Sequence, residues 1–306
     1  MVPYAASRLL LVFPTVLGVF VLVFLLVHLV PGDPAAMMLG ENASDADVAA
    51  LRTTLGLDRP LGVQLLDALR GAATLELGQS LHFSEPVADL LAERIGPTAL
   101  LASCALVLAI ACALPLGAMA ALHPGRAIDH ASMTAALLGI SIPSFWLGPL
   151  LLWLFAVKLD LFPTGGAEDA RGLVLPALTL ALPMTALLAR MSRASLLDEA
   201  RQDYVRVAES KGLSRSRAVL RHGLRNALIP IVTIVGLQFG SLLTGAIITE
   251  QVFAWPGLGG LLIEAIASRD YPLVQGTVLL FAVIYVLVNL ATDLVYAAVD
   301  PRVRLS

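Results

Sequence analysis

The side chains that commonly do chemistry are few in this sequence and lie far apart. Cys104 and Cys112 are eight residues apart, which is about 12 Å along a helix and beyond the reach of a disulfide. No G-x-x-x-x-G-K-[ST] loop for nucleotide phosphates occurs. No two histidines have the one-turn spacing of helical metal sites; they are His28, His82, His123, His130 and His222. We therefore expect no catalytic residues, no metal site and no cofactor bound by this chain.

The composition is that of a membrane protein. Hydrophobic residues make up 58% of the 306 positions and charged residues only 14%, whereas soluble domains carry about a quarter charged residues. Six runs are long enough to cross about 30 Å of hydrocarbon, and they cover 9–30, 98–122, 132–157, 173–190, 229–249 and 273–299. The first run is too long for a signal-peptide core. We expect an all-α integral membrane protein with six transmembrane helices, the first within 1–30.

Prolines interrupt four of these runs, at Pro14, Pro115, Pro143 and Pro183. Membrane helices tolerate such breaks when neighbouring groups satisfy the freed carbonyls. The prolines predict kinked helices, either packed around a pathway or without functional meaning.

The distribution of Lys and Arg predicts which ends are cytoplasmic. With the N-terminus inside, 13 of the 20 Lys and Arg residues lie in inside segments, and nine of these fall between Arg190 and Arg225. Both termini are then expected in the cytoplasm, including the tail at 300–306.

The first outside segment, 31–97, is too long for a simple connector. It contains amphipathic patterns such as VADLLAERI and turn signals such as PGDP and LDRP. This segment contains ten acidic residues and only four arginines. The excess of acidic residues favours either a solvated acidic surface or cationic cargo. We expect a small, partly helical extracytoplasmic cap.

The loop at 193–228 is the most charged part of the chain. Helical spacing in LLDEARQDYVRVAES is followed by Lys211 and Gly212, a typical helix end with a glycine at positive φ. Ser214 can cap a second helix, RSRAVLRHGLRNAL, before Pro230. Three functions suit a helix–glycine–helix element: docking of a cytosolic partner through an apolar knob of Val207, Ala208 and Leu213, contact with anionic lipid, or nucleic-acid binding. The membrane context disfavours nucleic acid, and the glycine turn favours docking.

This loop resembles the cytoplasmic loop of permease subunits from binding-protein-dependent ABC importers. The peptide branch, which serves dipeptides, oligopeptides, glutathione and nickel, is the most similar. Of the Glu-Ala-Ala-to-glycine motif of the general family only Ala208 and Gly212 match, but the branch's Tyr-Val-Arg lead-in and Arg-Asn-Ala triplet are present, at 204–206 and 225–227. Further matching segments are HLVPGDPA (28–35), LGLDRPL (55–61), GISIPSFWLG (139–148), EQVFAWPGLG (250–259), RDYPLVQG (269–276) and DPRVR (300–304).

The resemblance implies a type I (MetI-like) importer permease whose five-helix core, 98–299, includes the coupling loop 193–228. Such a subunit does no chemistry itself. It pairs with a second homologous permease, as a heterodimer or a homodimer, in the lipid of the bacterial cytoplasmic membrane. It also binds an extracytoplasmic solute-binding protein and two cytosolic ATPases, which use ATP and Mg²⁺. The residues that the resemblance places at the ATPase contact are Tyr204, Val205, Arg206, Val207, Ala208, Glu209, Gly212 and Leu213.

Residues elsewhere are candidates for the outer gate, the binding-protein contact or the pathway. The outer candidates are Asp33, Trp255, Pro256 and Asp270; Trp255 is equally an interfacial anchor. Asp293 lies within the last span, where a charge faces either a structural partner or a pathway. A peptide importer subunit is the leading hypothesis. A nickel importer of the same architecture and an ion-coupled secondary transporter, which needs intramembrane charges, are the alternatives.

Overall fold

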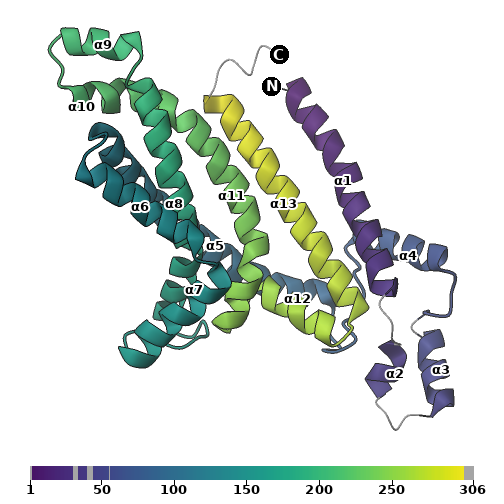
Figure 1. The fold of residues 1–306 in the computed structure, drawn as a ribbon. Helices are drawn as coiled ribbons and strands as arrows, with labels where there is room; N and C mark the ends of the chain where they lie inside the picture. The colour runs from purple at the N-terminus through teal and green to yellow at the C-terminus, as the bar shows by residue number, and fades with distance from the viewer. Residues whose placement is uncertain (1, 30–33, 40–43, 55, 300–306) are drawn as a thin grey trace. The chain divides into compact units, whose positions relative to one another are not determined.

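The computed structural model describes residues 2–29, 34–39, 44–54 and 56–299, and these form helices joined by turns (Figure 1). An isolated β-bridge joins Gln79 to Pro86. The α-helices are α1 Val2–Leu29, α2 Pro34–Leu39, α3 Asp45–Thr54, α4 Leu61–Thr74, α5 Val87–Leu122, α6 Ala127–Ser141, α7 Ser144–Leu151, α8 Val174–Glu199, α9 Asp203–Ser210, α10 Arg215–Ala218, α11 Leu224–Val252, α12 Leu258–Ala267 and α13 Tyr271–Val299. Two π-helical segments, η1 Leu152–Lys158 and η3 Val219–Gly223, and one 3₁₀ turn, η2 Ala170–Leu173, complete the set.

The apolar helices correspond to the predicted spans. Among the described residues, four segments are long and apolar enough to cross a membrane: Val87–Leu122, Ala170–Glu199, Arg215–Gly240 and Tyr271–Val295. A bent pair, Ala127–Ser141 with Ser144–Lys158, counts as a fifth if it is one span. The first predicted span lies in α1, whose described apolar part is the shorter stretch Pro14–Leu26.

The break that Pro143 predicts within the run 132–157 is present as a sharp bend. The chain bends by 101° between α6 and α7. Proline disfavours helical geometry in the residue before it, and Ile142, before Pro143, is extended with φ −88° and ψ 117°. The carbonyl of Pro143 then accepts from the Trp146 and Leu147 amides and starts α7. Pro14 and Pro183, by contrast, lie inside helices.

Helices at two other points run longer than predicted. VADLLAERI, an amphipathic pattern within the predicted cap, is the start of α5, which begins at Val87 and continues through the predicted span start at 98. The chain also does not break at Pro230, because this proline lies inside α11. The predicted cap, 31–97, thus holds α2, α3, α4 and the beginning of α5 in its described part.

The chain forms two compact units. The first comprises Met1–Ala5, Ala99–Trp255 and Leu287–Ser306, and the second comprises Ala6–Thr98 and Pro256–Val286. In the first unit α8 packs against α6, α7 and α11 (Figure 1). Gly117 of α5 lies so close to α8 that a Cβ there would approach the Ser192 Cβ to 2.5 Å and the Ala189 carbonyl oxygen to 2.7 Å. This close approach requires glycine.

In the second unit, a buried carboxylate joins two corners of the chain. Asp270 is fully buried and precedes α13. It accepts hydrogen bonds from the Ser80 hydroxyl (2.5 Å), the His82 amide (3.0 Å) and the Leu273 amide (3.1 Å). The Asp270 side chain therefore caps α13 and holds the turn between Ser80 and Phe83 against it.

Replacing Asp270 by alanine should destabilise the second unit, because three donors lose their acceptor inside the protein. We expect the free energy of unfolding to fall by about 3 kcal/mol, measured as a lower melting temperature in detergent. Asp270→Asn keeps one acceptor oxygen and should lose less. The exposed Asp169→Ala is the control; an equal loss in that variant would contradict the assignment.

Candidate functional site

The predicted helix–glycine–helix element is present, but its first helix is shorter than predicted. LLDEARQDYVRVAES forms the end of α8, a turn at 200–202, and then α9, Asp203–Ser210. Gly212 has φ +93°. Its amide donates to the Glu209 carbonyl at 2.9 Å, and the Leu213 amide donates to the Ala208 carbonyl at 3.3 Å. This pair of bonds is a Schellman motif, which satisfies the last carbonyls of α9 and requires the positive φ that glycine permits.

The second helix starts as predicted but without its predicted cap. Ser214 occupies the N-cap position of α10 with extended backbone, yet its hydroxyl makes no capping bond. The helix then runs through the π-helical turn Val219–Gly223 directly into α11. The elements α10 and α11 are therefore joined by continuous helical backbone.

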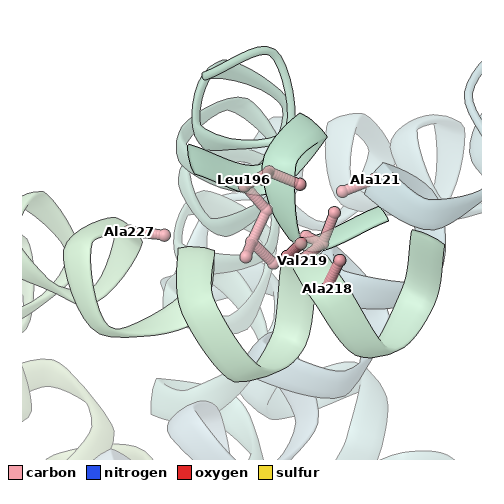
Figure 2. Close-up of a cluster of buried hydrophobic side chains, with 7 residues drawn as sticks. Ala121, Leu196, Ala218, Val219 and Ala227 are labelled. Carbon is pink, nitrogen blue, oxygen red and sulfur yellow. The ribbon is translucent and has the colours of Figure 1, made fainter. Parts of the chain in front are cut away.

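A cluster of buried apolar side chains, most of them alanines, joins α9 to its neighbours (Figure 2). Figure 2 shows Leu196, Ala218 and Val219 gathered together, with Ala121 and Ala227 on either side. We call this the coupling cluster; its buried members are Ala121, Leu196, Val205, Ala208, Ala218, Val219 and Ala227. These residues come from α5, α8, α9, α10, η3 and α11. The cluster thus joins α9 to three long apolar helices.

A polar contact supplements the cluster at the start of α9. The Tyr204 hydroxyl donates to the Glu199 carboxylate and accepts from the Asn226 side-chain amide at 3.2 Å. Burial raises the pKa of Tyr204 above its ordinary value, and the hydrogen bond to Glu199 raises it further. The phenol therefore stays protonated and links the ends of α8 and α11. A Cβ at Gly223 would lie 3.3 Å from the Glu199 Cβ, so a small residue keeps these two segments close.

The predicted coupling residues divide between the two faces of α9. Val205 and Ala208 are buried in the coupling cluster, and Leu213 packs against it. The predicted apolar knob of Val207, Ala208 and Leu213 is wrong in this respect: only Val207, which is 52% exposed, projects outward. Arg206, beside Asp203 at 3.7 Å, and Gly212 are also exposed, Tyr204 is 39% exposed, and Glu209 is half-buried.

An ion pair that sequence reasoning missed fixes the same end of the first unit. The Arg193 guanidinium binds Asp129 through Nε to Oδ1 at 2.5 Å and Nη2 to Oδ2 at 2.7 Å. Oδ2 also accepts from the Gly125 amide at 2.9 Å. The pair joins the first turn of α6 to α8, six residues before that helix ends. The sequence does place Asp129 just before the run 132–157 and Arg193 just after the run 173–190. No sequence pattern, however, indicates that these two charges meet.

The other predicted site residues lie apart from this element. Trp255 is buried, which does not fit an interfacial anchor, and Pro256 is half-buried. The fully buried Asp270 has the structural role described above. Asp293 is half-buried in α13. Asp33 and the tail at 300–306 lie outside the described residues.

Gly212→Val should loosen α9, because a β-branched residue at this positive φ costs about 1–2 kcal/mol. No atom lies within 4 Å of the added Cβ position, so the effect is conformational. We expect faster amide hydrogen exchange across 203–213. Gly212→Asn, which tolerates the left-handed region, should stay near wild type. Equal exchange in both variants would contradict a role of the backbone conformation.

Arg193→Gln should destabilise the first unit by about 3 kcal/mol, because it leaves the buried Asp129 carboxylate unpaired. The double variant Asp129→Asn with Arg193→Gln should be more stable than Arg193→Gln alone. A double-mutant cycle on the melting transition measures this coupling. Additive effects of the two substitutions would rule out the interaction.

Comparison with known proteins places the chain in a family over nearly its whole length. Residues 113–305 match the binding-protein-dependent transport system inner membrane component, and residues 1–102 match the N-terminal part of such membrane components. The glutathione transport system permease protein GsiC of Escherichia coli K12 is 45% identical over 304 residues, covering 99% of both chains. Its counterpart in Salmonella choleraesuis is 44% identical with the same coverage.

Solved structures share the fold. A chain of the MetNI methionine ABC transporter in an inward-facing conformation has a TM-score of 0.57 at 20% identity, covering 71% of this chain and all of that one. A chain of an amino acid ABC transporter has a TM-score of 0.53 at 17% identity, covering 70% of this chain and 94% of that one. The chain therefore belongs to the family of inner-membrane permease components of binding-protein-dependent ABC importers.

Proposed function

We propose that this chain is the permease subunit of an importer for glutathione or similar small peptides, which a solute-binding protein delivers. The observation that carries the substrate class is the 45% identity to a glutathione permease over 99% of both chains. The absence of a P-loop from the sequence agrees with a subunit that transports while its partners hydrolyse ATP. The chain itself then binds no cofactor; ATP and Mg²⁺ belong to two cytosolic ATPase subunits.

The exposed face of α9 is the part of this chain that meets an ATPase subunit. Val207 supplies an apolar contact, flanked by Arg206, Tyr204 and Glu209. Gly212 and Leu213 hold the turn that presents this face, and Val205 and Ala208 anchor it from below. The docking surface thus contains only half of the eight residues predicted at the ATPase contact, and the other half support it.

The coupling cluster transmits the movement of the ATPases to the membrane. Its members Ala121, Leu196 and Ala227 belong to α5, α8 and α11. Because these side chains are buried and closely packed, α9 cannot shift without displacing the helix ends. The Arg193–Asp129 pair extends the same connection to α6.

The proposed setting is the bacterial cytoplasmic membrane, with both termini and the loop 193–228 inside and the segment 31–97 outside. A second homologous permease completes the translocation pathway, and a heterodimer fits the family pattern best. Asp33 and Pro256 remain candidates for contact with the binding protein, and Asp293 remains a candidate for the pathway.

The test is reconstitution of the complete transporter, with its partner permease, ATPases and binding protein, in liposomes. We expect ATP-dependent uptake of labelled glutathione that requires the binding protein. Val207→Asp should reduce co-purification of the ATPase and uptake by about tenfold or more, because a buried charge would face the partner.

Val63→Asp places the same charge on an exposed valine of α4 and serves as the control. It should leave ATPase association unchanged. Normal ATPase association in Val207→Asp would overturn the docking assignment. Glutathione uptake driven by an ion gradient without ATP would overturn the importer class in favour of a secondary transporter.

A further inference from the structure

The second unit contains a cavity of about 210 Å³ that the proposed transport mechanism does not use. Its walls come from the end of α1, the start of α4 and the start of α13. The polar side chains that line it are His28, Arg59, Gln64, Asp67, Tyr271 and Gln275. Three segments singled out in the sequence, HLVPGDPA, LGLDRPL and RDYPLVQG, thus contribute to one cavity.

One wall of the cavity is fixed by hydrogen bonds. The Gln64 side-chain nitrogen donates to the carbonyls of Leu57 (3.3 Å) and Arg59 (2.8 Å), so its oxygen points to His28 Nε2 at 3.1 Å. His28 Nδ1 lies 2.7 Å from the Phe24 carbonyl. Both imidazole nitrogens therefore have oxygen partners. His28 forms part of the cavity wall and is not free to bind a metal.

The charged groups of the cavity form one close pair. Arg59 Nη1 lies 3.2 Å from Asp67 Oδ2, and both side chains are about half exposed, at 59% and 47%. Gly56, with φ +69°, lies beneath the Arg59 side chain; a Cβ there would be 3.6 Å from Nε. Arg70, 3.9 Å from Asp67, adds a second cation beside the pair. Cation and anion are thus presented side by side at solvent-accessible positions.

An α-amino-acid head group carries its ammonium and carboxylate on one carbon, at a separation similar to that of an ion pair. Such a ligand can replace the Arg59–Asp67 ion pair by two ion pairs, one between its carboxylate and Arg59 and one between its ammonium and Asp67. In an ordinary peptide the terminal charges sit on different residues, whose Cα atoms are about 3.8 Å apart or more. A γ-glutamyl compound, such as glutathione, keeps both charges on one carbon.

We propose that this cavity binds the α-amino-acid head group of γ-glutamyl compounds, and that it prefers them to α-linked peptides. The inference rests on the proposed function, because it names the substrate feature that the permease itself distinguishes. The volume of about 210 Å³ is below that of most complete ligand sites, which begin near about 300 Å³. The cavity therefore holds the head group, not the whole molecule.

The tail of the ligand has an adjoining place. A second cavity of about 230 Å³ shares Ala68, Pro272 and Gln275 with the first. Among the described residues that line it, Glu76 is the charged one. Glu76 lies in a tight turn: the preceding residue, Leu75, has φ +61°, and a Cβ on Gly71 would lie 2.5 Å from the Glu76 carbonyl oxygen. A carboxylate at the end of the tail meets Glu76, which weakens binding through repulsion.

Two isomers test the proposal: γ-glutamylglycine and α-glutamylglycine have the same composition and charge and differ only in linkage. Binding is measured by calorimetry on the purified permease pair in nanodiscs, without the binding protein. We expect γ-glutamylglycine to bind about tenfold or more tightly than the α isomer, and Arg59→Gln or Asp67→Asn to abolish this preference. Equal binding of the two isomers, or an unchanged preference in Arg59→Gln, overturns the proposal.

The controls separate binding from folding. Asp169 and Arg171 form an exposed pair at 2.8 Å in the first unit, and Arg171→Gln should keep the preference. Glu76→Gln should strengthen γ-glutamylglycine binding severalfold, a gain that misfolding cannot produce. Weaker docking of the binding protein in Arg59→Gln, with equal affinity for both isomers, assigns the cavity to that protein and overturns the proposal.

Uptake measured on the complete transporter distinguishes failure of the cavity proposal from failure of the proposed transport function. If ATP-dependent glutathione uptake occurs but the isomers bind equally, the cavity proposal fails and the transport function stands. If the preference for the γ isomer is present but uptake is absent, the cavity proposal stands and the transport function fails.

Discussion

The contact of α9 with the coupling cluster is the interaction on which the candidate site depends. A helix of eight residues is not stable alone in water, because its nucleation cost exceeds the gain from so few hydrogen bonds. Val205 and Ala208 supply the missing stabilisation by burying one face against Leu196, Ala218 and Val219. The opposite face, which carries Val207, stays exposed. One contact therefore creates the helix, orients it and connects it to the long helices.

Small side chains make this contact stiff. Alanine dominates the coupling cluster, and Gly117 and Gly223 lie where neighbouring segments approach most closely. Alanine and glycine lose little or no side-chain entropy on burial and leave few alternative packings. Under the proposed function, a displacement of α9 is then passed on as a movement of helices instead of being absorbed by rotamer changes.

Two buried carboxylates of the described residues have structural partners, while the charges proposed to meet ligands or subunits are exposed. Asp129 is held by Arg193 and the Gly125 amide, and Asp270 is surrounded by three donors. A carboxylate away from water is tolerated only when it is paired or hydrogen-bonded. Asp270 thus joins segments of the second unit, and Arg59 and Asp67 of that unit remain accessible.

The sequence by itself determined the helical class, most of the spans, the glycine turn at 212 and the family, because these follow from local composition, backbone conformation and motif order. It also indicated a break at Pro143, but it did not determine the size of the bend there, which is 101°. Only the tertiary structure decided that Ala208 faces inward while Val207 faces outward, and that Asp129 meets Arg193 across 64 residues of sequence. The same holds for the cavity that His28, Arg59 and Tyr271 share. Such contacts depend on how separate helices pack, and local patterns carry no information about that packing.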